Sequence, residues 1–65
     1  MTDTEYYQEV LKIGKLEEDG EIDVWQKLVL SILLNGYKYL ETRGFVKVPW
    51  QVILQDYLDV LEHSK

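Results

Sequence analysis

Residues 24–44, "VWQKLVLSILLNGYKYLETRG", carry the most informative pattern in the chain. Its polar residues recur every three or four positions, so on a helix they form one narrow line: Lys27, Ser31, Asn35, Lys38 and Thr42. Almost all the other residues are apolar, which is typical of a helix that lies between other elements. We therefore predict a central helix over residues 23–43, with Asp23 as its N-cap and Gly44 as its C-terminal stop.

The same stretch contains a competing signal, because Asn35 and Gly36 form a dipeptide that favours a two-residue hairpin turn. In a hairpin, residues 28–34 and 37–42 would be strands. The polar line runs through Asn35 without losing phase, which favours one continuous helix. A break into two shorter helices at Gly36 is the remaining alternative.

Two further segments with helical periodicity flank the central one. Residues 3–19 begin with Thr2 and Glu5 at the spacing of a capping box. Residues 49–63 begin with Pro49, which suits the first position of a helix. The extended residues 44–48, "GFVKV", have no evident partner strand. The sequence thus predicts an all-α fold, a single helical domain over residues 1–65 with three helices at about 3–19, 23–43 and 49–63.

The small size of the chain bears on how its second helix is covered. A domain of 65 residues buries only about 60% of the surface that its unfolded form exposes. Two short flanking helices are too small to cover every apolar side of the helix over 23–43. We expect that mostly buried helix to be sealed in a homodimer, with contributions from residues 49–63. The predicted partner or dimer interface consists of Trp25, Val29, Leu33, Tyr37, Trp50 and Tyr57.

Residues 15–26, "KLEEDGEIDVWQ", have the acids and the central glycine of a calcium-binding loop. With Gly20 at the sixth position, Lys15 takes the first position and Gln26 the twelfth, where carboxylates are required. We therefore predict no metal site, and interpret the stretch as an acidic turn that ends one helix and caps the next. The predicted acidic surface consists of Glu17, Glu18, Asp19, Glu21 and Asp23.

Groups that could carry catalysis are few. The chain has no cysteine and one histidine, His63, close to its end. Ser31 lies on the polar line in the middle of a helix, where a hydroxyl usually bonds to its own backbone or to solvent. Asp56 and Asp59 are three residues apart, but paired carboxylates need a pocket that shifts one pKa. We therefore expect no enzyme, no catalytic residue and no cofactor.

The charge of the chain argues against direct contact with nucleic acid. The net charge is −5, and residues 1–23 carry eight acids against two lysines. Residues 40–55 have the order helix, connection, helix of a helix-turn-helix reader of DNA. The leading turn of its second helix, residues 49–52, offers one glutamine among apolar residues, and three acids follow it. Nucleic-acid binding is therefore not the preferred prediction.

The preferred prediction is a small acidic protein-interaction module, an adaptor or inhibitor that docks an aromatic–aliphatic face on a larger protein. The first alternative is an acidic mimic of nucleic acid that blocks a basic groove of a nucleic-acid enzyme. The second is a DNA-binding regulator of the helix-turn-helix type. The sequence shows neither a secretory signal pattern nor an apolar run of membrane-spanning length, so we expect a cytoplasmic location and no membrane partner.

Overall fold

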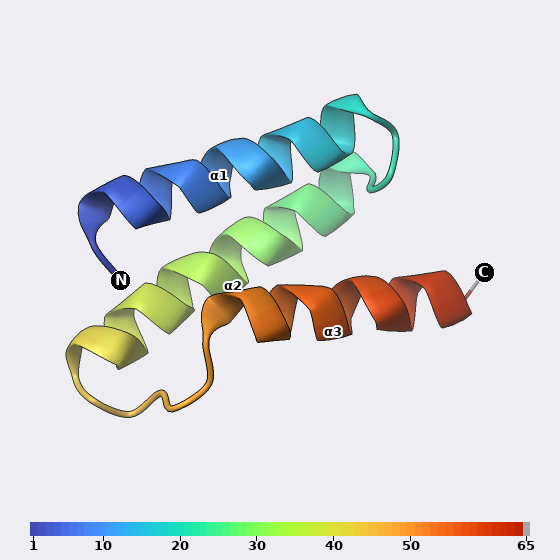
Figure 1. The fold of residues 1–65 in the computed structure, drawn as a ribbon. Helices are drawn as coiled ribbons and strands as arrows, with labels where there is room; N and C mark the ends of the chain where they lie inside the picture. The colour runs from blue at the N-terminus through green and yellow to red at the C-terminus, as the bar shows by residue number, and fades with distance from the viewer. Residues whose placement is uncertain (65) are drawn as a thin grey trace.

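Three α-helices make up the computed structural model, which describes residues 1–64 (Figure 1). The helices are α1 (Asp3–Glu18), α2 (Val24–Thr42) and α3 (Trp50–His63). No residue within 1–64 belongs to a strand. The predicted all-α class with three helices is confirmed, and each predicted segment extends no more than one residue beyond the helix observed at either end.

The helix starts follow from local hydrogen bonds at two of the three N-termini. Thr2 precedes α1, and its hydroxyl accepts from the Glu5 backbone N–H at 3.2 Å. Asp23 precedes α2 and forms a full capping box with Gln26, with both hydrogen bonds at 2.8 Å. Pro49 has φ −61° and ψ 144°, so it is the residue before α3 and not the first residue of the helix as predicted. Its extended ψ keeps it outside the helical region.

The stops of α1 and α2 are two glycines in the left-handed region, Gly20 and Gly44, each with φ 78°. In both turns the glycine N–H and the next N–H donate to carbonyls of the last helical turn at 2.9–3.0 Å. This pattern is a Schellman motif, and it favours glycine because a side chain would be strained there. The acidic stretch around Gly20 is therefore a helix-ending turn, as interpreted from the sequence.

α2 runs through Asn35 and Gly36 without interruption. The predicted continuous helix is confirmed, and both the hairpin and the break at Gly36 are wrong. The physical reason is that a continuous helix keeps Leu30, Leu34 and Tyr37 on one side, where all three are buried. Either alternative would remove that common packing face.

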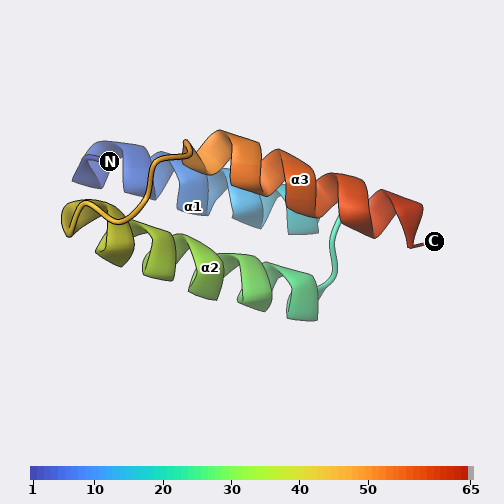
Figure 2. The ribbon, with the colours of Figure 1, turned by 90° about the horizontal axis from the view of Figure 1, so that it is seen from below.

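α2 is the central element, because it packs against both α1 and α3 (Figure 1). Seen from below, α1 and α3 lie in one layer and α2 lies in the other (Figure 2). The core forms between the layers and extends into the turn after α1. Its buried apolar residues are Ile13, Ile22, Leu30, Leu34, Tyr37, Trp50 and Leu54.

The two-layer arrangement leaves much of α2 uncovered. Only Leu30, Leu34 and Tyr37 are buried in this helix, so the predicted burial over most of its circumference is not reached within one chain. Both flanking helices lie in one layer beside α2, and the side of α2 that faces away from this layer is largely exposed (Figure 2). None of the described helices combines the length and the apolar character needed to span a bilayer.

Candidate functional site

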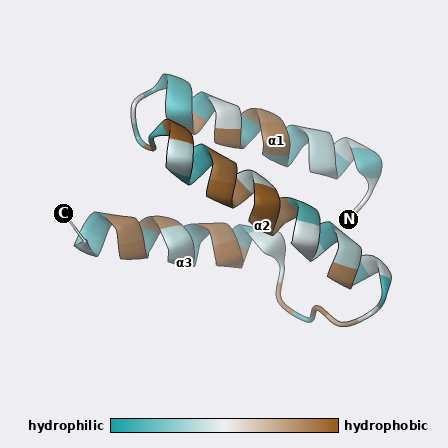
Figure 3. Cartoon of the chain, turned by 180° about the vertical axis from the view of Figure 1, so that it is seen from behind, coloured by the Kyte–Doolittle hydropathy of each residue, from teal (hydrophilic) through white to brown (hydrophobic). Residues whose placement is uncertain are grey.

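The side of α2 that faces away from the core is an exposed apolar surface, called here the free face. The molecule viewed from behind shows α2 with hydrophobic residues along much of its middle (Figure 3). The exposed fractions on this face run from 42% for Val29 to 76% for Trp25. The free face consists of Trp25, Leu28, Val29, Ile32, Leu33, Tyr39 and Leu40.

The free face and the core face lie on opposite sides of the same helix. Residues two positions apart are separated by about 200° around an α-helix. Leu30 and Leu34 have 0% exposure, whereas Ile32 between them is 65% exposed. α2 therefore has two apolar stripes, and the fold uses only one of them for its own core.

A groove of about 410 Å³ borders the free face on the α3 side. Gly36 lies in it, and a Cβ built on this glycine would meet no atom within 4 Å. The missing side chain therefore opens the surface of α2 at this point. The groove is lined by Ile32, Leu33, Gly36, Tyr37, Leu40, Val46, Trp50 and Ile53.

Three of the six predicted interface residues lie on the free face: Trp25, Val29 and Leu33. Two others, Tyr37 and Trp50, are core residues with exposures of 7% and 1%, and both also line the groove.

Their rings pack within the chain, with centroids 5.7 Å apart, and the Tyr37 hydroxyl donates to the Val48 carbonyl at 2.7 Å. Both rings therefore belong to the core and also form part of the groove wall. The sixth residue, Tyr57, is partly buried against the core.

Four residues of the free face were not among the predicted interface residues: Leu28, Ile32, Tyr39 and Leu40. The pattern in the sequence that identifies such residues is helical spacing from Trp25. Steps of three, four and seven residues lead from Trp25 to Leu28, then to Ile32 and to Tyr39, which keeps them on one side of a helix. The buried residues Leu30, Leu34 and Tyr37 recur at the same kind of spacing. The spacing therefore identifies two apolar stripes on the helix, but it does not show which of them is exposed.

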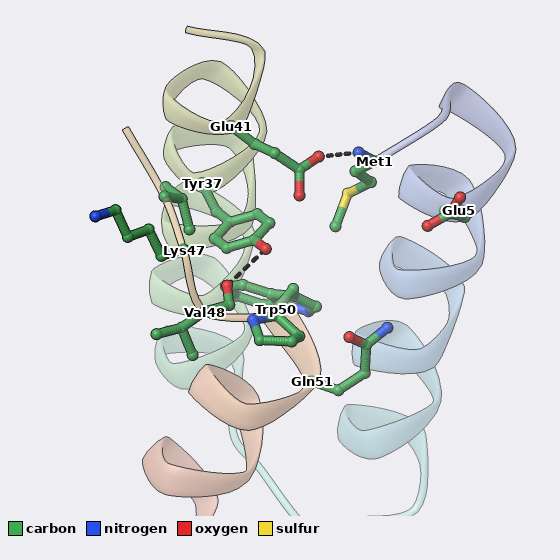
Figure 4. A pocket seen from close by; sticks show the side chains of 10 residues that line it. Met1, Glu5, Tyr37, Glu41, Lys47, Val48, Trp50 and Gln51 are labelled. Carbon is green, nitrogen blue, oxygen red and sulfur yellow. Dashed lines mark hydrogen bonds and ion pairs between the residues drawn. The ribbon is translucent and has the colours of Figure 1, made fainter. Parts of the chain in front are cut away.

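A second hollow lies between the start of the chain, α2 and the connection to α3 (Figure 4). The polar groups that face it are largely engaged in contacts within the chain. The Met1 amino group pairs with the Glu41 carboxylate, and the Tyr37 hydroxyl donates to the Val48 carbonyl (Figure 4). We interpret this hollow as part of the packing that joins the α3 connection to the rest of the fold.

The first turn of α3 is partly engaged in contacts within the chain, which bears on the DNA-reading alternative. Trp50 is buried, and the Gln51 side-chain amide donates to the Glu9 carboxylate at 3.4 Å. The second carboxylate oxygen of Glu9 and the Trp50 indole N–H are buried without a hydrogen-bond partner within residues 1–64. A recognition helix needs its leading turn at the surface, and here that turn is partly occupied by the fold.

The acidic turn is partly neutralised within the chain. Glu17 lies 3.6 Å from the Lys27 ammonium group, and Asp23 is the N-cap of α2. Glu18, Asp19 and Glu21 remain exposed. Across residues 1–64, no group of three or more histidine, cysteine or acidic side chains is arranged to hold a metal ion.

The candidate catalytic side chains Ser31, Asp59 and His63 have ordinary structural surroundings. The Ser31 hydroxyl donates to the Lys27 carbonyl one turn earlier at 2.8 Å, a usual bond for serine inside a helix. Asp59 accepts from the Gln55 side chain at 3.0 Å on the exposed side of α3. His63 lies in the last turn of α3 and is exposed.

An exposed ion pair joins the start of α1 to α2. The Lys38 ammonium group donates to Asp3 at 2.7 Å and lies 4.5 Å from the centre of the Tyr6 ring. The hydrogen bond from Lys38, followed by its charge, lowers the pKa of Asp3 below the usual 3.8. A lowered pKa stabilises the folded chain above pH 3.8, and this contribution is lost as the pH falls through the lowered value.

We therefore expect the Lys38→Met variant to raise the Asp3 pKa back toward 3.8. The reason is that methionine keeps the apolar contact with Tyr6 but supplies neither the hydrogen bond nor the charge. An NMR titration of the Asp3 side-chain carbon measures the effect. Lys27→Met, which removes a cation that lies opposite Glu17 instead, is the control. An Asp3 pKa that does not move in Lys38→Met would contradict the assignment.

Apolar contact is the chemistry that the free face and its groove can provide. None of the seven residues of the free face carries a formal charge, and two of them are aromatic. Compared with protein-family models, with curated proteins and with solved structures, the chain matches none.

Proposed function

We propose that this chain is a small, non-catalytic protein-interaction module that docks through the free face of α2 and the groove beside it. The observation that supports this most directly is the second apolar stripe, with Ile32 exposed between the buried Leu30 and Leu34. The exposed fractions of the seven residues correspond to roughly 700 Å² of accessible surface, polar atoms included, and exposed apolar patches above a few hundred Å² mark interaction sites.

The composition of the free face fits a protein partner. Tryptophan and tyrosine are enriched at the energetic centres of protein interfaces, and the face offers Trp25 and Tyr39 among aliphatic residues. Along one edge runs the polar line of α2, which includes Ser31 and Asn35. An apolar centre with a polar rim is the usual anatomy of such an interface.

The proposal is tested by photo-cross-linking in the cells that make the protein. A photoreactive phenylalanine analogue replaces Ile32 at the centre of the free face or, as the control, Asp56, which is exposed on α3. We expect a covalent protein adduct from position 32 and none from position 56. Val29→Glu in the same chain should abolish the adduct, because it places a charge in the apolar contact.

Absence of an adduct at position 32 would overturn the proposal, and so would equal labelling from both positions. The mass of the adduct also identifies what kind of molecule covers the free face. The adduct mass therefore distinguishes a second copy of this chain from a different protein.

A further inference from the structure

We infer that the occupant of the free face is a second copy of the chain, bound antiparallel, with Trp25 of each copy in the groove at Gly36 of the other. The inference rests on the proposed function, since it names the partner for the same surface. Three features of the chain support the inference: the position of Trp25 relative to Gly36, the area of the free face and the distribution of charge.

Trp25 and Gly36 present a projection and a notch on the same side of α2. They are eleven residues apart, close to three turns of about 3.6 residues, so both point in nearly the same direction. Trp25 is 76% exposed, the highest fraction on the free face, and Gly36 lies in the apolar groove with open space where a side chain would be. The chain therefore carries both a large exposed anchor and a recess for one.

A two-fold axis halfway between these residues lets both contacts form at once. Two antiparallel copies of α2 related by that axis place each Trp25 at the level of the partner's Gly36, about 16 Å along the helix from its own. Val29 then lies at the level of the partner's Ile32, and both residues lie next to the axis. A two-fold interface needs such a self-complementary surface, and the absence of a side chain at Gly36 allows the helices to approach closely.

The area of the free face is close to what each partner contributes to an interface of standard size. Roughly 700 Å² of accessible surface per chain on the free face compares with about 800 Å² per partner in an interface of standard size. The groove residues contributed by the connection and by α3, Val46 and Ile53, extend the surface. A second copy can therefore cover the face without any further element.

Charge selects the antiparallel orientation. The turn before α2 carries the exposed acids Glu18, Asp19 and Glu21, whereas Arg43 and Lys47 follow its C-terminal end. Arg43 stacks on the Tyr39 ring at 4.6 Å, and neither cation forms an ion pair within residues 1–64. Antiparallel copies bring acidic and basic ends together, whereas parallel copies would place one acidic turn beside the other.

The first experiment measures molar mass by sedimentation equilibrium on the purified full chain from about 1 to 100 μM, a range that spans ordinary dissociation constants. We expect twice the mass of one chain in the upper part of this range. Gly36→Gln should weaken the dimer by roughly 30-fold or more, because the new side chain fills the recess for an anchor residue. The same change does not threaten the fold, since glutamine favours helix more than glycine does.

Gly14→Gln is the matched control, because Gly14 is also a helical glycine with open space around it but lies on α1. It should leave the mass unchanged. The mass of a single chain at 100 μM would overturn the inference, and so would a Gly36→Gln variant that dimerises as tightly as the Gly14→Gln variant.

The second experiment tests orientation with a thiol cross-linker that spans about 10 Å, the ordinary distance between packed helices. The chain has no cysteine, so a single introduced thiol reports one position. Ile32→Cys should cross-link to its counterpart near the axis. Tyr39→Cys should not, because antiparallel pairing separates the two positions by about 25 Å along the helices. Efficient cross-linking of Tyr39→Cys would indicate parallel pairing and overturn the inference.

The two proposals fail in different ways. A purified chain of single mass, together with a cellular adduct at position 32 that contains a different protein, would overturn the second copy and leave the interaction module standing. A purified chain of single mass without any cellular adduct at position 32 would overturn both.

Discussion

Replacing Trp50 by alanine is expected to remove roughly a third or more of the stability of the chain. Trp50 is 1% exposed and joins α3 to α2 through its contact with Tyr37. Removing a buried tryptophan costs about 3–5 kcal/mol, and we expect a value near the lower end because its indole N–H is buried without a partner in the described residues. A chain of 65 residues has about 3–10 kcal/mol of stability in total.

The control for this prediction is Trp25→Ala, which removes the same side chain from the free face. Both changes are made in a chain that also carries Ile32→Glu, so that no second copy covers α2. Urea unfolding followed by far-UV circular dichroism gives the free energy of unfolding of each variant. We expect Trp25→Ala to cost less than about 1 kcal/mol, as is usual for surface positions. Equal losses for the two tryptophans would show that α3 does not pack as described.

Leu34→Ala is expected to have an effect of similar size, a loss of about 2–5 kcal/mol of unfolding free energy. Leu34 has no exposed surface and lies at the centre of the core face of α2. The matched variant is Leu33→Ala, which makes the same chemical change one residue earlier, where 43% of the residue is exposed. Helix propensity changes equally in both, so the difference between them reports packing alone.

Leu34→Ala and Leu33→Ala are each introduced into the chain that carries Ile32→Glu, and urea unfolding gives the free energy of unfolding of each variant. We expect Leu33→Ala to lose about 1 kcal/mol or less, since much of its side chain already contacts solvent. A larger loss for Leu33 than for Leu34 would mean that the free face and the core face have been exchanged. That outcome would also remove the basis of the proposed interface.

The placement of the core determines what the surface of this protein can do. A single chain packs one stripe of α2 against two helices and leaves the other stripe in water. Covering the second stripe removes apolar area from solvent at about 25 cal/mol per Å². Any partner that binds only the folded chain therefore also stabilises the fold, which links folding and association in so small a domain.

Local chemistry made much of the fold predictable from the sequence. Thr2 and Asp23 start helices because their side chains accept backbone N–H groups nearby, and Gly44 ends one because the left-handed conformation favours glycine. α2 continues through Gly36, as the regular helical spacing of the polar line predicted. All these features depend on residues within a few positions of one another, so a sequence pattern is sufficient to identify them.

Three of the six predicted interface residues lie on the free face, and the packing decided where the other three lie. Tyr37 and Tyr39, or Trp25 and Trp50, are equivalent by residue type, yet one of each pair is buried and the other exposed. A helix that is apolar on most of its circumference has no single hydrophobic side, so its periodicity does not say which stripe meets the core.

Three helices, their ends to within one residue and the excess of apolar residues on the second helix could therefore be predicted from the sequence. Only the tertiary structure decided which stripe of α2 remained exposed. The reason is that α1 and α3 lie in one layer beside α2, which buries Leu30 and Leu34 and leaves Ile32 in solvent. Contacts between elements distant along the chain make that choice, and no local pattern encodes it.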